Sequence, residues 1–258
     1  MNFNFKKKYG QNFLQDKTTI TNIVNSINAS VDDLIIEIGP GAGALTKSLA
    51  KKNSYLIAYE IDTDAMDYLS FLENDKVKVI YDDFLKRDVF NDIKDINYKN
   101  LYIIGNLPYY ITTPIITKII ESNLRPKELV FMVQKEVADR FTAKVSTREY
   151  GSISVFLNYY FDTKKLFVVD RKKFYPVPNV DSAVIKLTHK ENQISVDIEK
   201  FNKIIKDSFR FKRKNLRNNL KGYDLEKIAS ILDEHGLTLD HRAENLNYKV
   251  FVDIANKY

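Results

Sequence analysis

The sequence contains no cysteine and no tryptophan, and only three of its 258 residues are histidine. The absence of cysteine excludes disulfide bonds, thiolate zinc sites and a cysteine nucleophile. His189, His235 and His241 lie in polar surroundings and show no ligand spacing, so we expect surface histidines and no metal site.

Long hydrophobic runs are also missing. No apolar run approaches the roughly 20 residues that a membrane-spanning helix needs. The charged segment from Met1 to Lys8 is not followed by the apolar stretch of a signal peptide. We therefore expect a soluble, cytoplasmic protein with no membrane partner.

Acidic residues are the minority, and the basic excess is concentrated near one end of the chain. The formal net charge is +6, and from Lys200 onward 13 Lys and Arg stand against 8 Asp and Glu. The densest cluster contains no acidic residue and comprises Arg210, Lys212, Arg213, Lys214, Arg217 and Lys221. Such a cluster favours a polyanion partner, although a solvated helix face would have the same composition.

Short apolar segments alternate with segments of helical spacing over the first two thirds of the chain. We expect strands at 34–38, 55–60, 77–81, 101–104 and 129–133, with further β-rich segments at 166–169 and 184–187. Helices are expected at 18–27, from 45 to 51, and at 64–72 and 114–122. The alternation predicts an α/β fold with a doubly wound, Rossmann-like parallel sheet, whose ligands bind at the carboxyl ends of the strands.

The sequence changes character after a polar link that begins at His189. From about residue 194 the apolar residues recur at helical spacing, as Ile204, Ile205 and Phe209 do. We therefore predict a catalytic domain over 1–190 and a small C-terminal α-helical domain over 191–258.

A glycine-rich turn follows the first predicted strand of the α/β part. Gly39 and Gly41 come directly after that strand, and Glu60 ends the next strand 21 residues after Gly39. This spacing is typical of a dinucleotide or S-adenosylmethionine site, in which the carboxylate binds ribose hydroxyls. Asp82 and Asp83 offer an acceptor for an adenine amino group and favour the methyl donor, although a helix N-cap is a competing role for Asp83.

The tetrapeptide Asn106-Leu107-Pro108-Tyr109 comes at the end of the fourth predicted strand. The Asn106 amide oxygen and a backbone carbonyl of Leu107 or Pro108 can accept hydrogen bonds from an exocyclic amino group. Tyr109 offers a face on which a nucleobase can stack. Taken alone, the tetrapeptide is equally compatible with a polar turn after a core strand.

Several motifs in register extend these local patterns to most of the chain. The motifs are Gln11-Asn12-Phe13-Leu14, Glu37-Ile38-Gly39-Pro40-Gly41, the tetrapeptide, Val133-Gln134-Lys135-Glu136-Val137 and Phe174-Tyr175-Pro176-Val177-Pro178-Asn179-Val180-Asp181-Ser182-Ala183. With them the chain closely resembles the rRNA adenine N6,N6-dimethyltransferases, from about Lys6 to near the C-terminus.

Other functions remain as alternatives. Pro40, Leu107 of the tetrapeptide and the pair Asp181-Ser182 favour the small-subunit branch of the family over the antibiotic-resistance methylases of large-subunit rRNA. A non-catalytic or dual-role RNA-binding assembly factor is a second alternative. A methylase of small molecules or of DNA adenine is a third.

The resemblance implies an enzyme that uses S-adenosyl-L-methionine to dimethylate two adjacent adenosines in the 3′-terminal hairpin loop of small-subunit rRNA. It further implies that this monomeric enzyme acts on a pre-assembled small ribosomal subunit during ribosome biogenesis. The basic cluster defined above would then bind RNA phosphates.

The resemblance also assigns roles to individual residues. Those implied for cofactor binding are Asn12, Leu14, Gly39, Gly41, Glu60, Asp83 and Asn106. Those implied for catalysis are Asn106, Leu107, Pro108, Tyr109 and Phe174, with Phe174 stacking on the target base opposite Tyr109. Asp83 is preferred to Asp82 because it precedes the apolar pair Phe84-Leu85.

Overall fold

The computed structural model describes residues 12–108, 111–122, 124–191 and 193–258. The chain divides into two compact units. Unit 1 holds the described residues up to Ala138 together with Lys164–His189, and unit 2 holds Asp139–Thr163 and Lys190–Tyr258. The second division falls after His189, one residue before the predicted boundary, but residues 139–163 belong to unit 2 and not, as predicted, to the same unit as the residues before them.

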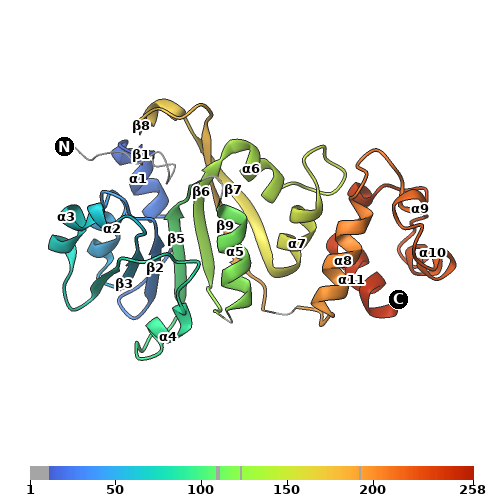
Figure 1. Cartoon of the computed structure of the whole chain (residues 1–258), viewed down its shortest axis with the longest axis horizontal. Helices are drawn as coiled ribbons and strands as arrows, with labels where there is room; N and C mark the ends of the chain where they lie inside the picture. The colour runs from blue at the N-terminus through green and yellow to red at the C-terminus, as the bar shows by residue number, and fades with distance from the viewer. Residues whose placement is uncertain (1–11, 109–110, 123, 192) are drawn as a thin grey trace. The chain divides into compact units, whose positions relative to one another are not determined.

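Unit 1 is built on a mixed sheet of seven strands (Figure 1). Their order is β4 (Val77–Ile80), β3 (Tyr55–Tyr59), β2 (Leu34–Ile38), β5 (Leu101–Asn106), β6 (Glu128–Gln134), β9 (Ser182–His189) and β7 (Phe161–Val169). The pairs from β4 to β6 are parallel, as expected, whereas β9 runs antiparallel to β6. The α/β class with a mostly parallel sheet is thereby confirmed.

The helices of this part of the chain are short. They are α1 (Lys17–Val24), α2 (Thr46–Leu49), α3 (Met66–Leu69), α4 (Val89–Ile93), α5 (Thr112–Glu121) and α6 (Lys135–Phe141). Asp16 caps α1 by accepting a hydrogen bond from the Thr19 N–H at 2.9 Å. Ile23 of α1 and Leu49 of α2 are buried in one apolar cluster with Ile35 of β2, so these helices cover one face of the sheet.

Short 3₁₀ turns extend two of these helices. η2 (Ala50–Lys52) continues α2, whereas η3 (Thr63–Ala65) and η4 (Ser70–Leu72) flank α3. The helices predicted from 45 to 51 and from 64 to 72 are therefore present as mixed α and 3₁₀ segments.

A second, two-stranded sheet joins distant parts of unit 1. β1 (Phe13–Leu14) pairs antiparallel with β8 (Phe174–Tyr175), so that Leu14 lies opposite Phe174. β8 follows the 3₁₀ turn η5 (Arg171–Lys173). Lys173 reinforces the pairing through an ion pair with Asp16 at 2.8 Å.

Unit 2 is mainly helical, as predicted for the C-terminal part. Its helices are α7 (Ser152–Tyr160), α8 (Ile198–Ser208), α9 (Leu216–Asn219), α10 (Leu225–Asp233) and α11 (Tyr248–Lys257), with the 3₁₀ turn η6 (Ala243–Asn245). Tyr150, Val155 and Tyr159 are buried in one apolar cluster with Phe201 and Phe251. This shared core explains why α7 belongs with the C-terminal helices.

No helix in the described ranges is long and apolar enough to cross a membrane.

At Gly105 the backbones of β2 and β5 lie too close together to admit a side chain. A Cβ atom at this position would lie 2.6 Å from the Ile38 carbonyl oxygen, which belongs to the backbone and cannot rotate away. We expect Gly105→Ala to lower the free energy of unfolding of unit 1 by about 1–3 kcal/mol. Urea unfolding followed by hydrogen exchange of the β5 amides would measure this loss.

The matched control is Gly222→Ala, because a Cβ atom there would have no neighbour within 4 Å. Equal stability of the two variants would show that β2 and β5 can separate without cost.

Candidate active site

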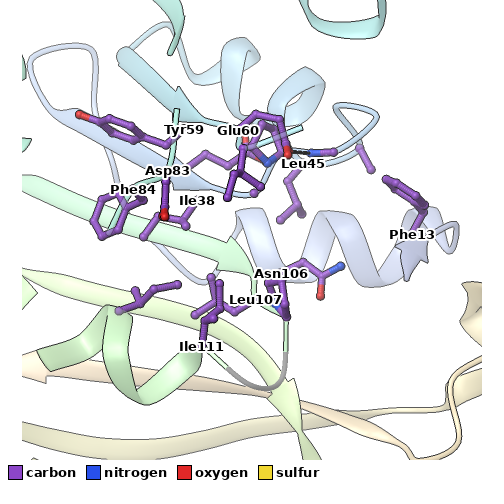
Figure 2. Close-up of a pocket in the computed structure, with 18 of the residues that line it drawn as sticks. Phe13, Ile38, Leu45, Tyr59, Glu60, Asp83, Phe84, Asn106, Leu107 and Ile111 are labelled. Carbon is purple, nitrogen blue, oxygen red and sulfur yellow. Dashed lines mark hydrogen bonds between the residues drawn. The ribbon is translucent and has the colours of Figure 1, made fainter. Parts of the chain in front are cut away.

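The carboxyl ends of β2, β3, β4 and β5 surround a cavity of about 320 Å³. Because these strands are parallel, residues that are far apart in the sequence meet at one edge of the sheet. Figure 2 shows Tyr59, Asp83 and Phe84 at one end of the cavity and Phe13 at the other. Glu60 and Asn106 lie on opposite sides in this view.

The glycine-rich turn forms one wall and is held by Glu60. Gly39 and Gly41 adopt the left-handed backbone conformation, with φ of 70° and 55°, which favours glycine. The Gly41 N–H donates to Glu60 Oε2 at 2.8 Å, and the Asp62 N–H donates to Glu60 Oε1 at 2.9 Å. Glu60 therefore fixes the glycine turn, a role that its spacing alone did not indicate.

Phe13 covers this turn. A Cβ atom at Gly41 would lie 2.5 Å from Cε1 of Phe13, so only glycine allows the ring to pack directly on the backbone. Asn12 and Leu14, on either side of Phe13, also line the cavity. The three residues bring the N-terminal motif to the predicted cofactor site.

The described lining of the cavity is acidic. It contains the carboxyl groups of Glu37, Glu60, Asp82 and Asp83, and it contains no Lys, Arg or His. Glu37 is buried, and its polar neighbours are Thr46 and the Glu60 carboxylate. Burial, with a smaller contribution from the charge of Glu60, raises the pKa of Glu37 to about 8.

The turn after β4 carries Asp82 and Asp83. Asp83 Oδ1 accepts a hydrogen bond from the Leu85 N–H at 3.0 Å, so its side chain also stabilises the turn. Asp82 Oδ1 accepts from the Asp83 N–H at 2.7 Å. Both residues line the cavity, and the capping role considered for Asp83 is thus compatible with ligand binding.

Asn106 ends β5 with a defined amide orientation. Its Nδ2 donates to the Asn12 carbonyl oxygen at 3.0 Å, which leaves Oδ1 as an acceptor beside the cavity. The Pro108 carbonyl accepts a hydrogen bond from the Ile111 N–H at 3.2 Å. The Pro108 carbonyl thus already has one hydrogen bond from the protein. Tyr109 lies outside the described residues.

Phe174 is not among the described residues that line the cavity. Its side chain is 3% exposed and packs in the apolar cluster that contains Leu14. Its neighbour Tyr175 is 55% exposed. The stacking of Phe174 on a target base stays a prediction, and in this structure the ring forms part of the core.

Sequence reasoning missed several apolar lining residues, namely Phe13, Leu45, Tyr59, Ile61, Phe84, Leu85, Ile111 and Ile115. Phe84 and Leu85 follow directly after the acidic pair, and that adjacency was the available signal. Tyr59 immediately precedes Glu60 and is indistinguishable in sequence from other strand aromatics.

The predicted RNA-binding residues lie in unit 2, from Arg210, two residues after the end of α8, to Lys221, two residues after the end of α9. All six side chains of the basic cluster are exposed. Arg217 Nε lies 3.5 Å from Asp240 Oδ1, and Lys212 Nζ donates to the Arg148 carbonyl. Arg213, Lys214 and Lys221 make no ion pair with any described residue. Exposed Phe211 beside Arg210 adds an aromatic ring that the sequence reasoning did not consider.

Within the described ranges, no group of three or more His, Cys, Asp or Glu residues is arranged to hold a metal ion.

Comparison of the whole sequence with known proteins gives a consistent result. Residues 2–258 match the family described as ribosomal RNA adenine dimethylase. The chain is 44% identical to a Mycoplasma mobile protein named ribosomal RNA small subunit methyltransferase A, over 97% of each chain. It is 42% identical to a Streptococcus pneumoniae protein of the same name, over 98% of this chain and 92% of that protein.

Solved structures share the fold. A dimethyladenosine transferase from Plasmodium falciparum superposes with a TM-score of 0.78 at 23% identity, covering 94% of this chain and 95% of that one. The 23S rRNA methyltransferase ErmE superposes with a TM-score of 0.73 at 24% identity, covering 95% and 99%. On the match along its whole length and on the identity to its relatives, the chain belongs to the ribosomal RNA adenine dimethylase family.

Proposed function

We propose that this methyltransferase binds S-adenosyl-L-methionine in the cavity and dimethylates the N6 atoms of adenosines in small-subunit rRNA. The names of the relatives and the resemblance of the motifs support the substrate. The observation that carries the cofactor assignment is the acidic cavity next to the Asn106 turn.

The acidic lining distinguishes between the two cofactors that the glycine turn permits. A dinucleotide carries a pyrophosphate, which needs backbone N–H groups or basic side chains. Here the Gly41 N–H is already bonded to Glu60, and no basic side chain is found among the described lining residues. The sulfonium and ammonium groups of S-adenosylmethionine are cations, which an acidic lining attracts.

When bound, S-adenosylmethionine supplies an electrophilic methyl group. Glu60 would accept hydrogen bonds from the ribose hydroxyls through its remaining lone pairs, and Asp83 would accept from the adenine amino group. Asn12, Phe13 and Leu14 would close the opposite end, because they line the cavity there.

Asn106 and a neighbouring backbone carbonyl would activate the target amine. The N6 lone pair of adenine is delocalised into the ring, and two acceptors that bind its N–H groups favour a more tetrahedral nitrogen. Asn106 Oδ1 can act as one acceptor, because Nδ2 is tied to Asn12, and a backbone carbonyl of Leu107 or Pro108 would be the second. Fixed acceptors contribute through positioning and electrostatics, so no strong general base is required.

RNA binding would depend on the basic cluster of unit 2. Arg213, Lys214 and Lys221 are exposed and not neutralised by described acidic residues. Contacts of this kind to phosphates give strong, salt-dependent binding. We propose that they hold the rRNA of a pre-assembled small subunit while the target adenosines are unstacked in a single-stranded loop. A role as an assembly factor could coexist with catalysis on the same surface.

Replacing Asn106 tests the proposed chemistry. We expect Asn106→Ala to lower dimethylation by at least about 100-fold, because one fixed acceptor for the N6–H group is lost. Donor binding should fall only partly. Mass spectrometry of the 3′-terminal rRNA hairpin after incubation with isotope-labelled donor measures both methylations. Asn91→Ala, at an exposed site in α4, is the matched control. Undiminished turnover by Asn106→Ala would refute the assigned mechanism.

The buried carboxyl of Glu37 predicts proton-linked donor binding. The groups that face it are the Glu60 carboxylate and the Thr46 hydroxyl. With a pKa of about 8, Glu37 is mostly protonated at pH 7 in the free protein. A bound cation lowers that pKa, so binding should release a proton. Donor affinity should therefore rise with pH below about 8 and level off above it.

Calorimetry in buffers with different ionisation enthalpies would measure the released proton. Glu37→Gln keeps the size of the side chain but cannot ionise, so its donor affinity should be independent of pH in this range. The same pH dependence in both proteins would assign the proton to another group.

Reversing charges tests the RNA surface. We expect Arg213→Glu, Lys214→Glu and Lys221→Glu, combined, to weaken binding to the small subunit. The slope of log affinity against log salt concentration should fall by about 2 to 3. The control reverses Lys200, Lys206 and Lys249, which are equally exposed in unit 2 but outside the cluster. Equal losses in filter-binding assays of the two triple variants would indicate nonspecific attraction, and no loss in the first would place the RNA surface elsewhere.

A further inference from the structure

A set of polar contacts connects one end of the cavity to α4. Tyr59, the last residue of β3, is 2% exposed, and its hydroxyl donates to Asp92 Oδ2 at 3.0 Å. Arg87 donates from Nε to the same oxygen at 3.1 Å, and its Nη2 bonds to Asp92 Oδ1. We call Tyr59, Arg87 and Asp92 the clamp.

In the clamp, both carboxyl oxygens of the buried Asp92 side chain accept hydrogen bonds. The Asp92 side chain is only 6% exposed, whereas that of Arg87 is 38% exposed. Burial opposes ionisation, but hydrogen bonds from Arg87 and Tyr59 hold the pKa of Asp92 below its usual value. Burial and the neighbouring Asp92 raise the pKa of Tyr59, so its hydroxyl remains a donor. A two-pronged guanidinium–carboxylate contact of this type fixes geometry as well as charge.

Backbone hydrogen bonds connect the clamp to the turn after β4. The N–H groups of Lys86 and Arg87 both donate to the Asp83 carbonyl, at 2.9 and 3.2 Å. Arg87 also reaches Asp82, with 3.5 Å between Nη1 and Oδ2. Arg87 thereby joins the turn that carries Asp83 to Asp92 in α4.

Ring packing provides a second connection to the cavity. Phe84 is buried with its ring at 78° to that of Tyr59, and the ring centroids are 5.3 Å apart. Tyr59, Asp83 and Phe84 line the same end of the cavity (Figure 2). The hydroxyl that holds Tyr59 in place points to Asp92. A change in the clamp would therefore move both the aromatic wall and the carboxylate at this end.

The position of this turn in the fold makes such support necessary. β4 is the edge strand of the sheet, so the turn that follows it has a neighbouring strand on one side only. Glu60, in contrast, follows β3 and Asn106 ends β5, and both of these strands are paired on both sides. The clamp supplies the restraint that a further strand would otherwise provide.

We propose that Arg87 and Asp92 are positioning residues that set the selectivity of the cavity for the adenine ring of the methyl donor. They act through Tyr59 and the Asp83 turn and do not touch the donor themselves. This inference rests on the proposed function, in which Asp83 accepts a hydrogen bond from the adenine amino group. Hypoxanthine carries an oxo group in place of that amino group and is the discriminating competitor.

The test compares S-adenosylmethionine with its inosine counterpart in the intact protein. For Arg87→Met and for Asp92→Asn we expect the KM for S-adenosylmethionine to rise about tenfold, with kcat and the KM for rRNA nearly unchanged. The preference for adenine over hypoxanthine should fall by a similar factor. Arg87→Lys, which keeps the charge but not the two-pronged contact, should retain part of the preference. The base preference is the ratio of the KM values for S-adenosylmethionine and its inosine counterpart. Because both are measured on the same sample, this ratio does not depend on the fraction of protein that has unfolded.

The control is Lys186→Met, which removes another largely buried ion pair of unit 1. Lys186 Nζ lies 2.8 Å from Glu128 Oε1, and neither residue lines the cavity. The base preference of this variant should equal that of the unmodified protein.

Asp83→Ala distinguishes the positioning role of the clamp from the proposed contact of Asp83 with the adenine amino group. If Asp83→Ala loses the base preference while Arg87→Met and Asp92→Asn keep it, the clamp has no positioning role and the proposed function stands. If none of the three variants changes donor binding, the assignment of the adenine end fails as well. A loss of preference in Lys186→Met equal to that in Arg87→Met would also overturn the inference, because the effect would then be general.

Discussion

The parallel pairing of β2 with both β3 and β5 determines almost everything else about the site. It places the glycine turn between Glu60 on one side and Asn106 on the other, so that cofactor and catalytic residues from separate segments meet at one edge. The pairing is close because Gly105 has no side chain to press on the Ile38 carbonyl. Two close contacts at the edge of the cavity, this one and that of Phe13 on Gly41, thus depend on glycine.

The acidic lining then determines which ligands the cavity favours. Charged carboxyl groups are costly to bury, and burial of Glu37 raises its pKa to about 8. That cost is consistent with a site that becomes complete only when a cation binds. Burial also raises the pKa of Glu60, but its carboxyl oxygens accept hydrogen bonds from the backbone N–H groups of Asp62 and Gly41, which oppose that rise. The two carboxyl groups therefore suit different tasks, one holding the protein turn and the other responding to the charge of the ligand.

Much of this arrangement could be predicted from the sequence, because apolar runs mark buried parallel strands and ligands bind where such strands end. The strands from β2 to β6, the glycine turn and the position of Asn106 follow from that logic. The antiparallel direction of β9 could not be predicted, because an apolar run does not encode strand direction. The place of residues 139–163 in unit 2 could not be predicted either. It depends on the contacts of Tyr150 and Tyr159 with core residues that lie 40 or more positions further along the sequence.

Side-chain roles were harder to predict than positions. The orientation of the Asn106 amide depends on the Asn12 carbonyl, 94 residues earlier, and no local pattern contains that bond. The burial of Phe174 depends on its pairing with Leu14 across the small sheet. These two facts are linked, because Asn12 and Leu14 belong to the same short segment. The amide that would bind the target amine and the aromatic ring implied in base stacking are thus both held by residues 12–14. The β1–β8 pair and the bond that orients Asn106 therefore depend on the placement of the same short segment.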